Sequence, residues 1–168
     1  MMNAAEIIYF RRFLDIHDPE NRDNRRAFHE NYEWLEGYWR SQFGENYFDQ
    51  VWKKYGAYYW ENVPKLKNIA QVLAGLRPVG NNENPGYDPT HEVEEATKLL
   101  LALNKTPQLH FRALMIVIRQ IRNNLFHGGK MELEGGDQYN RNKQLVILAK
   151  DTTNSILEKL EEAERTCP

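Results

Sequence analysis

The stretch TPQLHFRALMIVIRQIRNNLFHGGK, residues 106–130, contains the longest helical pattern in the chain. Its apolar residues recur at spacings of three and four, which is the pattern of a helix with one buried face. Thr106 is suited to cap the start of this helix, and Gly128 and Gly129 are suited to end it. We therefore predict a helix from Pro107 to Phe126 whose core stripe consists of Phe111, Leu114, Ile118, Ile121 and Leu125.

The rest of the chain is also helical in its apolar spacing, and no segment alternates at a period of two. Further helices are predicted over residues 4–16, 25–41, 47–59, 64–76, 91–103 and 141–163. Residues 77–92 are dominated by proline, glycine and asparagine and read as a loop. The predicted fold is an all-α helical bundle of five or more helices, formed as a single domain over residues 1–168.

Overall composition excludes several classes of protein. The net charge of −2 gives no general attraction to nucleic acid or membranes, and no run of 18 apolar residues is present. The single cysteine, Cys167, cannot form an internal disulfide, which is typical of a reducing compartment. The first residues become charged too soon for a signal peptide. A soluble, cytoplasmic protein without a membrane partner is expected.

Aromatic residues are concentrated in one segment. Twelve of the 20 lie between Tyr32 and Trp60. Packing in a core or interface is the favoured interpretation, because aromatic side chains bury large areas. A stacking platform for unpaired bases is an alternative, although such platforms usually alternate with cations. A dimer or partner surface is a third interpretation.

Basic side chains accumulate around the helix over residues 107–126. No Asp or Glu occurs from Leu99 to Met131, whereas this span contains Lys105, Arg112, Arg119, Arg122 and Lys130. Arg112, Arg119, Asn123 and His127 project to the side opposite the core stripe, and Arg122 lies at its edge. Complementing the helix dipole explains the basic residues near the C-terminus but not Arg112. We therefore predict an anion site that attracts an RNA backbone through Arg112, Arg119 and Lys130.

The end of this helix combines three side chains suited to phosphate chemistry. His127 can move protons near neutral pH, and Arg122 can hold two phosphate oxygens at once. Asn123 can orient either group without adding charge. Together these residues could cleave RNA without a metal ion. The alternative, equally weighted on spacing alone, is that His127 only caps the last carbonyl groups of the helix.

The motif RNNLFH, residues 122–127, resembles the Arg-x4-6-His motif of the HEPN superfamily (higher eukaryotes and prokaryotes nucleotide-binding). The following GGK and the helix-like stretch NRNKQLVILAKDTTNSILEKL, residues 140–160, also fit that family. The resemblance is strongest over residues 107–160.

The resemblance implies an all-α, HEPN-like bundle that forms a homodimer with two motifs facing each other. Arg122, Asn123 and His127 would be the catalytic residues of an endoribonuclease that needs no metal or cofactor and leaves a 2′,3′-cyclic phosphate. Members act in toxin–antitoxin, phage-defence and RNA-processing systems, so an antitoxin or regulatory protein is a further implied partner beside RNA. Other members are inactive, which keeps a non-catalytic module that binds RNA, nucleotide or protein as the alternative.

Two histidine–glutamate pairs have a spacing that could contribute metal ligands. Glu33 follows His29 by one helical turn, and Glu95 follows His91 in the same way. Either pair would hold a metal ion only with additional ligands. Solvated surface pairs are the favoured interpretation, and no metal site is predicted.

Overall fold

A computed structural model describes residues 18–76, 90–102, 104–126 and 137–168. Within these ranges the chain forms helices and no strand, which confirms the all-α prediction. The predicted helix over residues 4–16, most of the loop over residues 77–92 and the glycines that would end the helix at Phe126 lie outside the described residues. The helices are α2 (Pro19–Phe43), α3 (Tyr47–Val51), α4 (Ala57–Asn62), α5 (Pro64–Leu76), α6 (Thr90–Leu101), α7 (Pro107–Phe126), α8 (Asp137–Glu158) and α9 (Leu160–Thr166).

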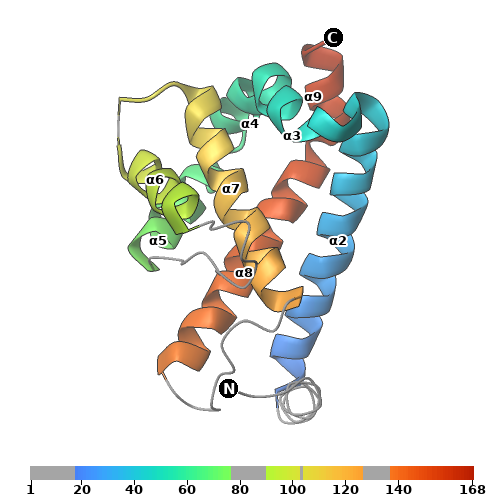
Figure 1. Cartoon of the computed structure of the whole chain (residues 1–168). Helices are drawn as coiled ribbons and strands as arrows, with labels where there is room; N and C mark the ends of the chain where they lie inside the picture. The colour runs from blue at the N-terminus through green and yellow to red at the C-terminus, as the bar shows by residue number, and fades with distance from the viewer. Residues whose placement is uncertain (1–17, 77–89, 103, 127–136) are drawn as a thin grey trace.

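The two longest helices run side by side in the same direction. In Figure 1, α2 and α8 both rise from the bottom of the view to the top, and α7 passes in front of α8 in the opposite direction. The short helices α3 and α4 lie at the top near α9, and α5 and α6 lie on the other side of α7. The central position of α7 explains why its sequence is the most apolar long stretch of the chain.

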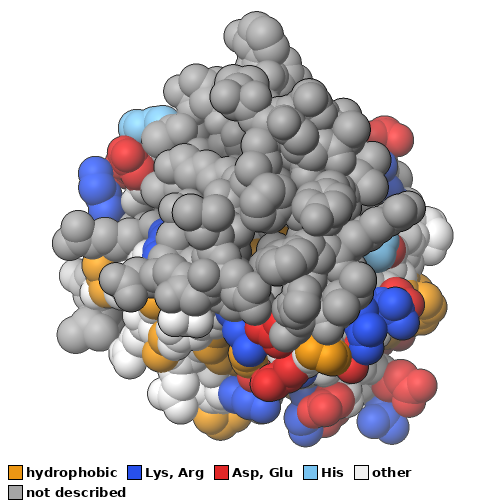
Figure 2. Space-filling model, turned by 90° about the horizontal axis from the view of Figure 1, so that it is seen from below, with side chains coloured by type: hydrophobic (Ala, Val, Ile, Leu, Met, Phe, Trp, Pro, Cys, Tyr) orange, Lys and Arg blue, Asp and Glu red, His pale blue; other side chains and the backbone are white. Residues whose placement is uncertain are grey.

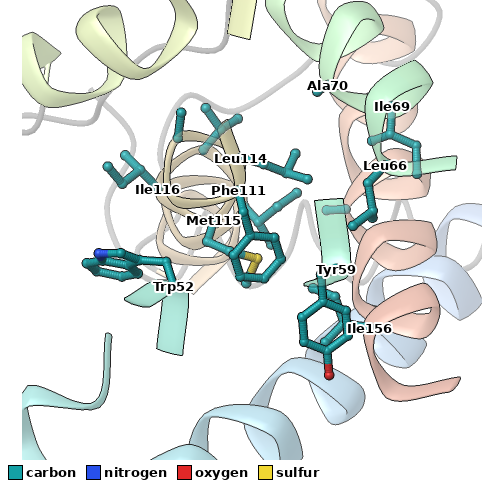
Figure 3. Close-up of a cluster of buried hydrophobic side chains, with 14 of the residues drawn as sticks. Trp52, Tyr59, Leu66, Ile69, Ala70, Phe111, Leu114, Met115, Ile116 and Ile156 are labelled. Carbon is teal, nitrogen blue, oxygen red and sulfur yellow. The ribbon is translucent and has the colours of Figure 1, made fainter. Parts of the chain in front are cut away.

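The core is built around α7. Figure 3 shows Phe111, Leu114 and Met115 of α7 among side chains from α4, α5 and α8. The Phe111 ring stacks on Tyr59 of α4, with ring centroids 5.4 Å apart and an interplanar angle of 11°. Burial extends beyond the predicted stripe to other sides of the helix. The buried apolar residues of α7 are Phe111, Ala113, Leu114, Met115, Ile116, Val117, Ile118 and Ile121, while Leu125 is half-buried.

The aromatic segment packs into this core, as the favoured interpretation predicted. Its buried members are Tyr32, Trp39, Tyr47, Trp52, Tyr55, Tyr58, Tyr59 and Trp60. Rings in these positions are covered by protein and are not available for stacking on bases. Tyr38, Phe43 and Phe48 are half-buried against the core. Trp34 is 55% exposed and stacks on Tyr38 with ring centroids 5.3 Å apart.

A π-helical turn, Trp52–Gly56, joins α3 to α4 and brings the backbone against α7. A Cβ atom on Gly56 would lie 3.2 Å from the Cα of Gln108 and 3.2 Å from the Cβ of Trp52. Glycine therefore allows a close approach of the two backbones, and a larger side chain here would force its neighbours to shift. The predicted helix over residues 47–59 is present, but this wider turn interrupts its α-helical geometry.

Polar side chains connect α2 to α8 along their length. Lys143 Nζ lies 3.0 Å from a carboxylate oxygen of Asp18, and Lys150 Nζ donates to Asn24 at 2.8 Å. Asn31 Nδ2 donates to Asn154 Oδ1 at 2.6 Å, and the Tyr38 hydroxyl donates to Glu164 of α9. The partners are separated by 123 to 126 residues in every case. Positions along α2 therefore match positions along α8 and α9 with an almost constant offset.

Helix boundaries follow local capping chemistry. The α5 and α7 bounds agree with the prediction, and the Thr106 hydroxyl accepts from the Leu109 N–H at 3.4 Å as the expected cap. The helix predicted to begin near residue 25 begins earlier, at Pro19, because the Asp18 carboxylate accepts from the Asn21 N–H at 3.1 Å. It ends at Phe43, because Gly44 adopts a positive φ of 76°.

The helix predicted over residues 91–103 is α6, which runs from Thr90 to Leu101. One other predicted boundary was wrong. A single last helix was predicted over residues 141–163, whereas α8 begins at Asp137 and ends at Glu158, with α9 following after Lys159. Hydroxyl groups of Thr152, Thr153 and Ser155 donate to carbonyl groups four residues earlier, and such bonds bend helices. In the part of the chain that the structure describes, no helix has the length and apolar character needed to cross a membrane.

Candidate functional site

Arg122 lies near the end of α7 and faces α2. Its Nη2 donates to both carboxylate oxygens of Glu36, at 3.1 and 2.9 Å. A carboxylate oxygen of Glu33 lies 3.7 Å from the same nitrogen. The guanidinium also covers the Tyr32 ring, with Cζ 5.2 Å from the ring centroid. Because only 20% of the side chain is exposed, Arg122 is a half-buried cation with a fixed orientation.

Glu36 connects this arginine to a second one. The carboxylate is only 12% exposed, and Nη2 of Arg40, one turn along α2, lies 3.4 Å from it. Burial raises the pKa of the neighbouring Tyr47 hydroxyl, and the negative charge of Glu36 raises it further. Burial likewise raises the pKa of the Tyr32 hydroxyl, with smaller contributions from Tyr47 and Glu36. Both phenols therefore stay neutral beside a carboxylate that two arginines share.

The other two arginines of α7 have comparable surroundings. Arg119 Nη2 lies 2.9 Å from Oε1 of Glu92 on α6, and its Cζ lies 4.1 Å from the centroid of the Phe48 ring. The Cζ of Arg112 lies 5.2 Å from the Trp52 ring. Each arginine of α7 thus covers one aromatic ring of the segment 32–60, an arrangement favourable to a cation. The aromatic segment therefore contributes to the site by supporting these arginines.

Acidic groups from other helices balance much of the predicted positive region. The sequence has no acid from Leu99 to Met131, but Arg119 pairs with α6 and Arg122 pairs with α2. In Figure 2, which views the molecule from below, basic and acidic side chains lie next to each other where described residues reach the surface. Among the described residues, the charges of Arg119 and Arg122 are balanced by acids from other helices.

The remaining predicted site residues are Asn123, His127 and Lys130. Asn123 is half-buried and follows Arg122 in α7. Its neighbour Asn124 accepts from Gln120 Nε2 at 2.8 Å. His127 and Lys130 lie outside the described residues. The structure therefore arranges Arg112, Arg119 and Arg122 along the side of α7 that meets the aromatic segment, while the histidine of the motif stays a sequence prediction.

Sequence reasoning missed the carboxylates that hold the arginines. Glu33 and Glu36 come from α2, and Glu92 comes from α6. One signal was present, because Glu33, Glu36 and Arg40 recur at spacings of three and four and must share one side of a helix. Nothing in the spacing, however, indicates that this side meets α7.

The glutamates of the two histidine–glutamate pairs lie near cationic side chains. Glu33 is 3.7 Å from Arg122, and Glu95 lies 3.3 Å from Lys98 on the same helix. Among the described residues, no group of three or more histidine, cysteine or acidic side chains is arranged to hold a metal ion.

No protein-family model, curated protein or solved structure matches the chain. The site must therefore be interpreted from its own residues and from the motif at residues 122–127.

Proposed function

We propose that the protein is a metal-independent endoribonuclease of the HEPN type, with a composite site formed by two copies of the chain. The observation that carries the proposal is the placement of Arg122. The arginine of the RNNLFH motif is a half-buried, oriented cation near the end of the central helix of an all-α bundle. A charge fixed in advance is what stabilisation of a developing phosphorane requires.

The chemistry can be assigned to the residues of the motif. The 2′-oxygen of RNA attacks the adjacent phosphorus, and the bond to the 5′-oxygen breaks, which leaves a 2′,3′-cyclic phosphate. One group must accept the 2′-proton and another must give a proton to the leaving 5′-oxygen. One His127 can serve in one of these roles, and the His127 of a second copy in the other. Arg122 stabilises the charge on the phosphorane, and Asn123 orients the phosphate or the histidine.

A second candidate function is favoured by a specific observation. Both Arg119 and Arg122 are already paired with carboxylates, at 2.9 Å in each case. Such pairs also suit an architectural role. The alternative is therefore a non-catalytic HEPN-like module that binds RNA, nucleotide or a protein partner. The biological setting that the resemblance implies for the ribonuclease is a toxin–antitoxin or phage-defence system.

Cleavage in the presence of EDTA separates the two functions. The wild-type chain should cleave RNA with EDTA present, and His127→Ala should lower the rate by about 10²–10⁴. His91→Ala, which replaces an exposed histidine on α6, is the control and should retain the wild-type rate. Purified wild-type protein that binds RNA without turnover would favour the binding module instead.

Arg122 can be tested in the same assay under single-turnover conditions at saturating protein. Arg122→Ala should slow cleavage of bound RNA more than it weakens binding, because the strongest contact forms in the transition state. Arg122→Lys should not fully recover the cleavage rate lost in Arg122→Ala, since lysine lacks the planar guanidinium that holds two phosphate oxygens. Equal losses in binding for Arg122→Ala and Arg119→Ala, with unchanged cleavage, would reduce Arg122 to a steering charge.

A further inference from the structure

The two carboxylates that face Arg122 differ in how firmly they are held. Glu36 places both oxygens within 3.1 Å of Nη2, is 12% exposed, and also pairs with Arg40. Glu33 places one oxygen at 3.7 Å and is 46% exposed. Glu36 is therefore an inner partner held by two cations, and Glu33 is an outer partner at the surface.

This difference determines which partner a ligand can replace. A nearly buried carboxylate that holds Arg122 with both oxygens is costly to displace, because this arginine is only 20% exposed and would lose its closest partner away from bulk water. An exposed ion pair at the limit of contact distance contributes little to the free energy of folding, and salt screens its attraction. Phosphate oxygens bind a guanidinium in the same geometry as carboxylate oxygens, and usually at shorter distance than 3.7 Å. An incoming phosphate would therefore replace Glu33 and leave Glu36 in place.

We propose that Glu33 occupies the position at which Arg122 binds a backbone phosphate of RNA, and that RNA binding displaces it. The proposal rests on the proposed function for the identity of the anion. Glu33, Glu36, Arg40 and Arg122 together carry no net charge, so the resting cluster attracts anions weakly. When Glu33 moves away, Glu36 and the Tyr32 ring still hold the guanidinium, and one positive charge becomes available to the phosphate. Glu33 thus acts as an internal competitor that limits RNA affinity.

The test compares two substitutions of the same chemistry on one helix. Glu33→Gln removes the proposed competitor, and Glu30→Gln removes an exposed carboxylate less than one turn away on α2. The probes are inorganic phosphate, followed through arginine Nε–H resonances by NMR, and a 2′-O-methyl RNA oligonucleotide, which lacks the attacking hydroxyl, followed by fluorescence anisotropy. Glu33→Gln should bind both probes about three- to tenfold more tightly than Glu30→Gln does, as expected for loss of one exposed charge near a cation.

A double-mutant comparison links the gain to Arg122. In an Arg122→Ala background the difference between Glu33→Gln and Glu30→Gln should disappear, because the competitor no longer has a cation to compete for. Equal affinities of the two single variants would overturn the proposal, and so would a gain that persists without Arg122.

Two outcomes distinguish the anion position at Glu33 from the ribonuclease activity. Tighter phosphate binding by Glu33→Gln, in a protein that cleaves no RNA, would support the anion position and contradict the ribonuclease. RNA cleavage by the wild type, with no gain in Glu33→Gln, would support the ribonuclease and overturn the anion position.

Discussion

Glu36 of α2 connects that helix to α7 through its ion pair with Arg122. Its carboxylate is nearly buried and pairs with Arg40 and Arg122. Glu36→Gln keeps the size of the side chain but leaves two cations without their shared counter-charge. We expect the free energy of unfolding to fall by about 1–3 kcal/mol, less than for a fully buried pair because Arg40 is half exposed.

Urea denaturation would measure this change. Glu30→Gln is the matched control, and as an exposed substitution it should stay within about 0.5 kcal/mol of wild type. Indistinguishable midpoints for Glu36→Gln and wild type, with equal slopes, would show that the shared carboxylate is not a stabilising contact.

At the residue scale, sequence reasoning could identify the arginines but not their partners. Arg122 was selected from its own motif, and its position near the end of a long helix followed from the apolar spacing. Its main partner, Glu36, lies 86 residues earlier in the chain. Which helix faces which is a property of the tertiary packing, so the sequence alone could not show that Arg119 and Arg122 lie against carboxylates of other helices.

At the scale of the elements, two helical glycines should respond to alanine in opposite directions. A Cβ on Gly56 would lie 3.2 Å from backbone and side-chain carbons at the crossing with α7, whereas a Cβ on Gly37 of α2 meets nothing within 4 Å. Gly56→Ala should lower the free energy of unfolding by about 1–3 kcal/mol through overpacking. Gly37→Ala should raise it by about 0.5–1 kcal/mol, because alanine is the better helix former.

Thermal unfolding of the two variants beside wild type would decide the signs. A stable Gly56→Ala protein would mean that α7 can move away from the π-helical turn without loss of packing. A destabilised Gly37→Ala protein would mean that the outer side of α2 contacts something other than solvent.

The helices whose starts were most accurately predicted are those with a helix-starting proline or a capping residue. Pro64 starts α5, and Thr106 caps α7, so both helices begin where the sequence indicated. The break at Lys159 was missed, because it falls inside a continuous helical pattern of apolar residues that contains no proline or glycine. The π-helical turn was missed for a similar reason, since its apolar spacing remains close to that of an α-helix.

For the whole molecule, buried tyrosines predict a loss of stability at alkaline pH. Burial raises the pKa of Tyr32 and Tyr59, and the hydrogen bond to Glu164 raises the pKa of Tyr38 to about 12, from an ordinary value of 10.0. A pKa raised by folding means that the folded state favours the protonated phenol. This contribution is fully present below pH 10.0 and is lost as the pH rises through 12.

Phenolate absorbance at about 295 nm, recorded together with circular dichroism, would test whether the tyrosines ionise before or during unfolding. The buried tyrosines should ionise only as the helical signal is lost, and Tyr38→Phe should shift the onset of the transition. A smooth titration of all tyrosines around pH 10.0 in a folded protein would contradict it.

The parallel pairing of α2 with α8 has a consequence for how the chain folds. The side-chain bonds that connect them, such as those of Asn31 and Lys150, join residues more than 120 positions apart, whereas α6 and α7 are neighbours along the chain. Joining ends across so long a loop costs more conformational entropy than joining adjacent helices, so this contact should form after the barrier has been crossed. Asn31→Ala should then speed unfolding and leave the folding rate nearly unchanged in stopped-flow measurements. The seam that forms last would also be the first to open, and the lifetime of the native state would depend on it.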